Sequence, residues 1–146
     1  MRGAMTELSM AKLDRVLETA LYVDDLERAG RYYIDVLALE RLFEDERLRA
    51  FAVGGVNVLL LFRRGASATT AHLPGGTIPP HDGSGPLHVA FGIGDEELAG
   101  WEARLEAHQI AVEGRTAWPR GGHSIYFRDP DGHLVELATR GLWKIY

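Results

Sequence analysis

The chain has 146 residues, of which 46% are hydrophobic and 25% are charged, and its formal net charge is −5. Its length and composition fit one folded domain and exclude a largely disordered chain, while the acidic balance argues against nucleic-acid binding. The chain has no cysteine, which excludes disulfides, thiolate catalysis and thiolate metal ligands. No apolar run approaches the roughly 20 residues of a membrane span. No hydrophobic signal region begins the chain, so we expect a cytoplasmic protein with no membrane partner.

The first predicted elements are a strand over 16–23 and an amphipathic helix that follows it to about Leu37. Alternation places Glu18 and Tyr22 on one face of the strand and mostly apolar side chains on the other. One stripe of the helix should be buried; it consists of Leu26, Ala29, Tyr33 and Val36 or Leu37.

Three strands and a linker are predicted next. The strands cover 41–46, 49–53 and 57–63, and the Gly54–Gly55 pair is suited to the turn between the last two. Residues 64–84 are rich in Gly, Ala, Ser, Thr and Pro and show no periodicity, which is typical of a linker.

The second half of the chain repeats this plan. The predicted elements are a strand over 87–93, a helix over 96–107 that buries Leu98, Trp101 and Leu105, and strands over 112–116, 123–128 and 134–139. His88 holds the place in this copy that Glu18 holds in the first, 70 residues earlier. An internal repeat of this kind indicates the architecture of the whole chain.

The repeat predicts an α+β fold built from two βαβββ modules, over 13–63 and 85–140. One helix and four strands cannot close a core alone, so the modules are expected to pair into a curled eight-stranded mixed sheet shaped like a cup. A single domain would then span 13–146, after a loosely held extension over 1–12. The apolar end over 141–146 is expected to dock on the body or on a partner subunit.

Three ionisable residues fall on the concave face of this cup: Glu18, His88 and Glu136. Each has an ordinary explanation, because strand carboxylates are often salt-bridged at the surface and buried histidines are often hydrogen-bonded in the core. However, Glu18 lies on a strand that looks buried on both sides, and a buried carboxylate needs a partner or a metal. The coincidence of the three residues favours one shared divalent metal, and this donor set suits Mn²⁺, Fe²⁺, Zn²⁺ or Mg²⁺.

Four further side chains are weaker candidates. Tyr126 alternates toward the cup, where its hydroxyl could orient substrate or donate a proton, or where its ring could only pack. Arg120, in the glycine loop over 118–122, could bind an anionic group of a substrate, although a solvated arginine is the simpler interpretation. His81 in the linker could transfer protons at neutral pH or have no role. Tyr22 shares the face of Glu18 and is a candidate substrate contact.

Three segments carry a family resemblance. They are YVDDLERAGRYY over 22–33, LHVAF over 87–91 and YFRDPDGHLVEL over 126–137. They resemble the vicinal oxygen chelate superfamily, which includes glyoxalases, bleomycin-resistance proteins, fosfomycin-resistance enzymes and extradiol dioxygenases. The similarity covers about 13–142. It implies a paired βαβββ fold, usually dimeric, with a divalent metal in the cup.

The resemblance also implies metal positions, which fall on Glu18, Leu59, His88 and Glu136. Glu18 stands where histidine is commonest in the family, and Leu59 cannot bind a metal. The implied site therefore has three ligands and open positions. Whether the modules pair within one chain or swap across a homodimer stays open; in the swapped case Glu18 would meet the other two ligands across the dimer.

The expected function is that of a metal-dependent enzyme which uses the ion as a Lewis acid on a small substrate with vicinal oxygens. A lyase or isomerase is favoured over a ring-cleaving dioxygenase, because Fe(II) oxygenases typically use two His and one carboxylate. The alternative is a non-enzymatic protein of the bleomycin-resistance kind that sequesters a drug or metabolite.

Overall fold

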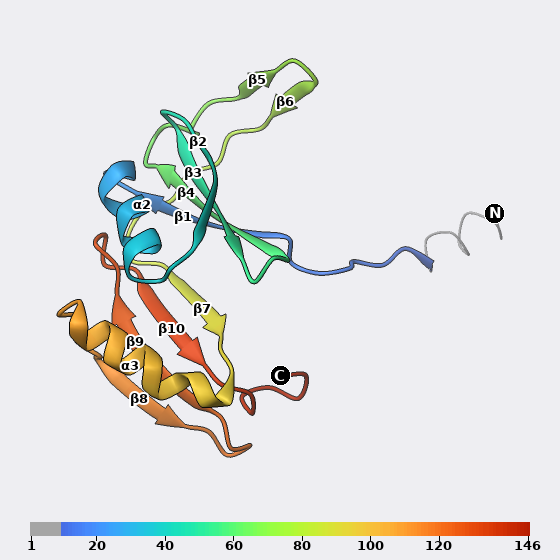
Figure 1. Ribbon diagram of the computed structural model, residues 1–146. Coiled ribbons are helices and arrows are strands. Elements are labelled where there is room, and N and C mark those ends of the chain that lie inside the picture. The colour runs from blue at the N-terminus through green and yellow to red at the C-terminus, as the bar shows by residue number, and fades with distance from the viewer. Residues whose placement is uncertain (1–9) are drawn as a thin grey trace.

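The computed structural model describes residues 10–146, which form two βαβββ modules and a small hairpin (Figure 1). The first module consists of β1 (Glu18–Val23), α2 (Leu26–Asp35), β2 (Glu40–Glu44), β3 (Leu48–Val53) and β4 (Asn57–Arg63). The second consists of β7 (His88–Gly92), the 3₁₀ turn η1 (Asp95–Glu97), α3 (Leu98–Ala107), β8 (Gly114–Ala117), β9 (His123–Arg128) and β10 (Leu134–Ala138). Neither helix is long and apolar enough to cross a membrane.

Helix α2 begins and packs as the pattern of its sequence predicts. The side chain of Asp25 accepts a hydrogen bond from the backbone N–H of Arg28 at 3.1 Å, which caps the first turn. The predicted stripe is buried at all of its positions: Leu26, Ala29, Tyr33, Val36 and Leu37. In α3, Leu105 is buried and Leu98 and Trp101 pack against the core with partial exposure.

The two modules have matching sheets. The strand orders are β1-β4-β3-β2 and β7-β10-β9-β8, and in each sheet the first two strands are parallel and the others antiparallel. The mixed α+β class is therefore as predicted. The predicted single eight-stranded sheet is not formed, because no ladder joins the two four-stranded sheets within residues 10–146.

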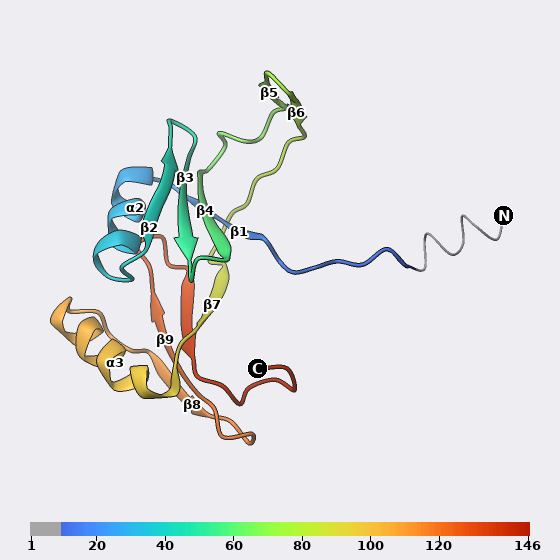
Figure 2. The same cartoon turned by 45° about the vertical axis from the view of Figure 1, so that its right-hand side comes forward.

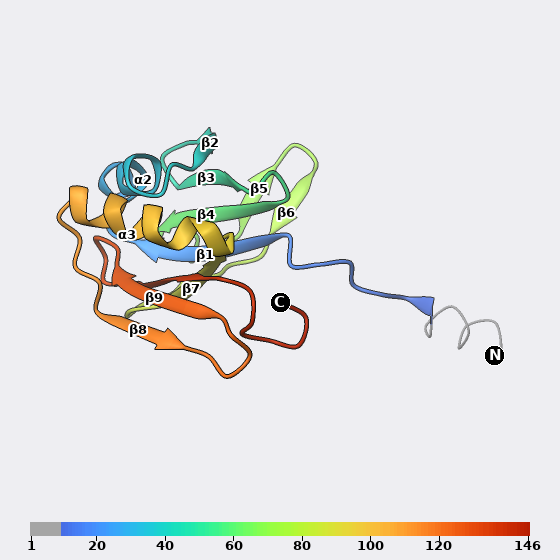
Figure 3. The same ribbon diagram turned by 60° about the horizontal axis from the view of Figure 1, so that its bottom comes forward.

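Both helices lie on the same side of the molecule, as Figures 1–3 show, and the two modules share one hydrophobic core. Alternation in the strands explains this arrangement, since every second side chain of the central strands points to the helices. The core includes Leu21, Tyr33, Leu61, Leu105, Phe127 and Leu137. The opposite face of each sheet, called the cup face here, carries Glu18, Ala20 and Tyr22 on β1 and His88, Ala90 and Gly92 on β7.

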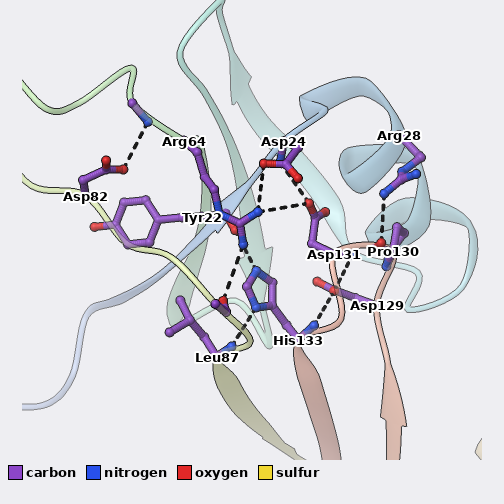
Figure 4. Close-up of polar contacts among 12 residues, drawn as sticks. Tyr22, Asp24, Arg28, Arg64, Asp82, Leu87, Asp129, Pro130, Asp131 and His133 are labelled. Atoms are coloured by element: carbon purple, nitrogen blue, oxygen red, sulfur yellow. Dashed lines mark hydrogen bonds and ion pairs between the residues drawn. The ribbon is translucent and has the colours of Figure 1, made fainter.

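A polar junction joins the modules at one end of the sheets (Figure 4). The ring of His133 is fully buried and accepts the backbone N–H of Leu87 through Nδ1 at 2.8 Å. Nε2 must then carry the proton, which it donates to the backbone oxygen of Tyr22 at 2.7 Å. Next to it, the Tyr33 hydroxyl donates to the buried Asp129 carboxylate at 2.8 Å. The predicted Asp-Pro-Asp-Gly turn therefore connects the second module to the first.

The predicted linker contains a hairpin that its composition does not reveal. Strands β5 (Ala71–Leu73) and β6 (Gly76–Ile78) pair with each other and project away from the sheets (Figure 2). The hairpin's base is held by the N–H of His81, which donates to the oxygen of Ser67 at 2.8 Å.

The C-terminal segment docks through its last residue. The Tyr146 hydroxyl donates to the backbone oxygen of Ala138 at 2.9 Å and lies directly over Gly92. Gly141 and Leu142 also lie against Gly122, whereas Trp143 and Ile145 are 72% and 94% exposed, so docking on the body is limited to the two ends of the segment.

Candidate functional site

The pairing register of the second sheet places four predicted or newly found polar residues on its cup face. On β7, His88 pairs with Leu134, two residues before Glu136 on β10, so the imidazole lies diagonally opposite the carboxylate. On β9, Tyr126 pairs directly with Glu136, and Ser124 follows on the same face. The backbone alone thus brings these side chains within reach of one another.

His88 and Glu136 face each other in the structure. His88 Nε2 lies 3.2 Å from Glu136 Oε1, with the histidine side chain 49% exposed and the glutamate side chain 8% exposed. His88 Nδ1 lies 2.9 Å from the backbone oxygen of Leu134. Because a carbonyl only accepts, Nδ1 carries a proton there, and Nε2 of a neutral ring presents a lone pair to the carboxylate. Two acceptors at this separation need a proton or a cation between them.

The second oxygen of Glu136 has its own donor. Ser124 Oγ donates to Glu136 Oε2 at 2.6 Å, and the indole Nε1 of Trp118 donates to Ser124 Oγ at 2.8 Å. Neither residue was predicted to belong to the site. The alternation that points Tyr126 to the cup also points Ser124 there, so this partner was visible in the sequence, whereas the contact from Trp118 depends on the fold of a loop.

This pair fits part of a divalent metal site. Histidine ligands of metals commonly donate their other ring N–H to a backbone carbonyl, as His88 does. Two ligand atoms at roughly 2.1 Å from one ion and at right angles would be about 3.0 Å apart, close to the 3.2 Å between Nε2 and Oε1. However, no group of three or more His, Cys, Asp or Glu side chains suited to a metal occurs within residues 10–146.

Glu18 is the predicted ligand that the chain does not bring to this pair. It begins β1, and it is exposed, so the expectation that its strand is buried on both sides is wrong at this position. Burial in β1 is complete only at Leu21 and Val23, on the face toward the helices. The physical reason is that β1 is an edge strand with no neighbouring strand from the second module.

The fourth family position also needs a correction. Ala20 pairs with Leu60 on β4, just as Ala90 pairs with Glu136 on β10. Leu60 therefore matches Glu136, while Leu59 is 1% exposed and belongs to the core. The consequence for metal binding is unchanged, because neither leucine has a donor atom.

Tyr22 and His81 are brought together in the first module. The Tyr22 hydroxyl is hydrogen-bonded to His81 Nδ1 at 2.7 Å, and the His81 ring packs edge-on against Phe62 with centroids 4.5 Å apart. Burial, and then the negative charge of Asp82, raise the pKa of Tyr22 above its usual value. No hydrogen bond or ion pair connects the two residues to His88 or Glu136 in the described part of the chain.

The two remaining candidates lie at the second module. Tyr126 is half-buried beside Glu136. Arg120 is exposed at the tip of a loop that two hydrogen bonds close, from Trp118 N to Gly122 O at 2.8 Å and from Gly121 N to Trp118 O at 2.9 Å. The exposed guanidinium of Arg120 can contact either solvent or an anionic ligand.

The fold of two βαβββ modules around one core, and the histidine that faces a glutamate on one sheet, point to one superfamily of proteins. Residues 12–137 match the model of the Glyoxalase/Bleomycin resistance protein/Dioxygenase superfamily. The chain belongs to this superfamily, as its three motifs indicate.

Curated relatives and solved structures agree with this assignment. Metallothiol transferase FosB of Staphylococcus saprophyticus is 31% identical over 119 residues, which cover 80% of this chain and 71% of the relative. Catechol-2,3-dioxygenase of Bacillus subtilis is 29% identical over 132 residues, 85% of this chain and 42% of the relative. The crystal structure of lactoylglutathione lyase from Agrobacterium tumefaciens superposes with a TM-score of 0.83 at 37% identity, covering 92% of this chain and 99% of that one.

Proposed function

We propose that this protein is a metal-dependent enzyme in which His88 and Glu136 bind a divalent ion. The observation that carries the proposal is the pair of facing acceptors, Nε2 and Oε1, 3.2 Å apart with Nδ1 held by a carbonyl. The bound ion would act as a Lewis acid on adjacent oxygen atoms of a small substrate. Relatives named metallothiol transferase and lactoylglutathione lyase support an enzymatic and metal-linked role.

The favoured reaction class is a lyase, an isomerase or the addition of a nucleophile. With Glu18 as a third ligand, the set would be one His and two carboxylates. Fe(II) oxygenases typically use two His and one carboxylate, which argues against ring cleavage. The names of both relatives refer to thiol compounds. Since this chain has no cysteine, a thiol in its reaction would have to be a separate co-substrate. Mn²⁺, Fe²⁺, Zn²⁺ and Mg²⁺ are the candidate ions.

The third ligand would be Glu18 of a second copy, in a homodimer whose modules pair across the two chains. Three facts support this arrangement: Glu18 is exposed, the His88 side chain is 49% exposed, and the edge strands β1 and β7 are not joined within residues 10–146. Tyr22 would enter the same site with Glu18, because it shares the sheet face of Glu18. His81 would follow, because it is hydrogen-bonded to Tyr22. We assign proton transfer to His81 and Tyr126 and substrate contacts to Tyr22 and Arg120.

The first experiment is elemental analysis of the untagged protein after supplementation with Mn²⁺, Fe²⁺ and Zn²⁺. We expect about one divalent ion per chain in the wild type and a loss of the ion in Glu18→Ala, His88→Ala and Glu136→Ala. Absence of metal from the wild type under these three conditions and after supplementation with Mg²⁺ would contradict the proposal.

Mixing two variants tests the dimeric site. A Glu18→Ala chain still supplies His88 and Glu136, and a His88→Ala chain still supplies Glu18. After the chains are denatured together and refolded, mixed dimers with swapped modules contain one intact site each and regain metal. If each cup is built from one chain, every site keeps one defect and no metal returns.

A second function, ligand sequestration without catalysis, is favoured by one observation. An apolar cavity of about 180 Å³ lies between the modules and is lined by residues that include Leu39, Phe91 and Trp101. Such a cavity suits an apolar ligand. Binding of apolar ligands that persists in His88→Ala and in chelator-treated protein would favour this alternative.

A further inference from the structure

We infer that Ser124 and Trp118 are positioning residues that hold Glu136 in a form able to bind a metal through one oxygen. The inference rests on the proposed metal-dependent function, but its first step can be tested without metal. It concerns a chain of three groups, the Trp118 indole, the Ser124 hydroxyl and the Glu136 carboxylate, which run from a loop to the middle of β10.

The direction of these two hydrogen bonds follows from which groups can donate and which can only accept. An indole N–H is only a donor, so Trp118 Nε1 must donate to Ser124 Oγ at 2.8 Å. The Ser124 hydroxyl is then oriented with its own hydrogen toward Glu136 Oε2, at 2.6 Å. An ionised carboxylate only accepts, so the hydroxyl cannot reverse this hydrogen bond while Glu136 is charged. Glu136 thus receives one fixed hydrogen bond on Oε2 and presents only Oε1 to His88.

Burial makes this hydrogen bond hard to replace. Ser124 is 1% exposed and Glu136 is 6% exposed, so water has little access to take the place of the hydroxyl. A buried carboxylate oxygen needs a hydrogen-bond donor within the protein, and Ser124 is the donor to Oε2. Without Ser124, Oε2 would lose its donor, and the carboxylate could rotate or turn both oxygens toward a cation.

The indole itself is held by the loop that starts at Trp118. That loop closes on itself through the Trp118–Gly122 backbone hydrogen bond at 2.8 Å. At Gly122 the backbone passes so close to the C-terminal segment that a Cβ would lie 2.8 Å from the oxygen of Arg140. Such an approach is possible only for glycine. The same loop carries Arg120, so it joins a candidate substrate contact to the orientation of Glu136.

The first test uses the metal-free protein. The chain has three tryptophans, so an ¹H–¹⁵N spectrum contains three indole N–H signals, and Trp118→Phe assigns one of them. We expect the Trp118 indole signal to move in Ser124→Ala and in Glu136→Gln. Glu113→Gln is the matched control, because Glu113 is exposed and pairs with Arg128 on the same sheet. If the Trp118 indole signal does not move in Glu136→Gln, the inference that Ser124 links Trp118 to Glu136 is wrong.

The second test measures metal affinity by calorimetric titration with Mn²⁺ and Zn²⁺. Outer-shell partners typically contribute roughly 10–100-fold to affinity, so we expect a loss of this size in Ser124→Ala and a smaller loss in Trp118→Phe. Thermal unfolding confirms that both variants fold. Equal affinity of the wild type and Ser124→Ala would overturn the inference. A wild type that binds no metal would instead refute the proposed function, and the indole spectra would still decide whether Ser124 couples Trp118 to Glu136.

Discussion

The two βαβββ modules have the same topology and the same strand register, but their cup faces carry different side chains. In the second module, His88 and Glu136 form a polar pair that Ser124 supports. At the matching places of the first module stand Glu18 and Leu60, which cannot form such a pair. The two halves of the repeat therefore share topology and strand register, but they do not share the polar side chains of the candidate site. One half holds two candidate ligands and the other supplies at most one.

A second contrast lies at the far ends of β1 and β7. Tyr22 ends the cup face of the first sheet with its own ring, which packs against the chain at Gly83. The matching residue of the second sheet is Gly92, and the ring that lies over it belongs to Tyr146. Both sheets thus end under a tyrosine, but one is part of the strand and the other comes from the C-terminal segment. Tyr146 is the easier of the two to displace, because its neighbours Trp143 and Ile145 are exposed.

The largest expected effect sharpens the first contrast. Replacing Glu136 by Gln or His88 by Ala should weaken divalent metal binding by more than the roughly 10–100-fold typical of outer-shell substitutions, because a ligand itself is lost. The control is Leu60→Ala, which changes the position that matches Glu136 in the first module and should leave metal affinity within about twofold. Metal titrations of the three variants provide the comparison. A similar loss in Leu60→Ala would show that the two modules contribute alike.

A smaller effect is expected where the modules meet. Tyr33→Phe removes the donor to the buried Asp129 and should lower the free energy of unfolding by about 1–3 kcal/mol. Tyr32→Phe is the control, since its hydroxyl bonds to the oxygen of Arg128 in an exposed position and should cost less. Urea unfolding at pH 7 measures both. Equal costs for the two would mean that burial of the Tyr33 contact does not matter.

The same junction predicts a dependence on pH. Burial, and then the charge of Asp129, raise the pKa of Tyr33 well above 10. A group with a raised pKa in the folded state stabilises the fold fully below its unfolded pKa of about 10, and this contribution falls as the pH rises beyond that value. Unfolding of the wild type should therefore become easier above about pH 10, and the loss should be smaller in Tyr33→Phe. Urea titrations between pH 8 and 11 make the measurement.

Periodicity predicted the parts of this structure that depend on local pattern. The buried stripe of α2 and the shared face of Tyr126 and Ser124 follow from spacings of 3.6 and 2 residues. The same alternation predicted that His88 and Glu136 share the cup face, because both lie on strands of one repeat. Such inferences need no knowledge of how the two halves of the chain sit relative to each other.

Errors arose where the answer depends on long-range geometry. Burial of Glu18 was inferred from the apolar opposite face of its strand, but the edge of β1 has no partner strand within residues 10–146. The fourth family position was placed on Leu59, one residue away from Leu60, which matches Glu136. A shift of one residue reverses the face of a strand, and only the pairing register decides it. Trp118 was missed because a loop, and no periodic element, brings its indole to Ser124.

The smallest expected effect tests the second contrast. In Gly92→Ala, the added methyl group would occupy the place of the Tyr146 hydroxyl, so we expect the C-terminal segment to detach while the sheet stays intact. Gly114→Ala is the matched control on the same sheet, since its Cβ would lie at an ordinary 3.6 Å from the Tyr126 ring. Detachment should cost no more than about 1 kcal/mol, because only a few residues at a chain end lose their contacts. Limited proteolysis should remove the end faster from Gly92→Ala than from Gly114→Ala. If both variants are cut at the wild-type rate, the Tyr146 contact does not hold the segment, and the likeness between the two sheet ends is limited to the backbone.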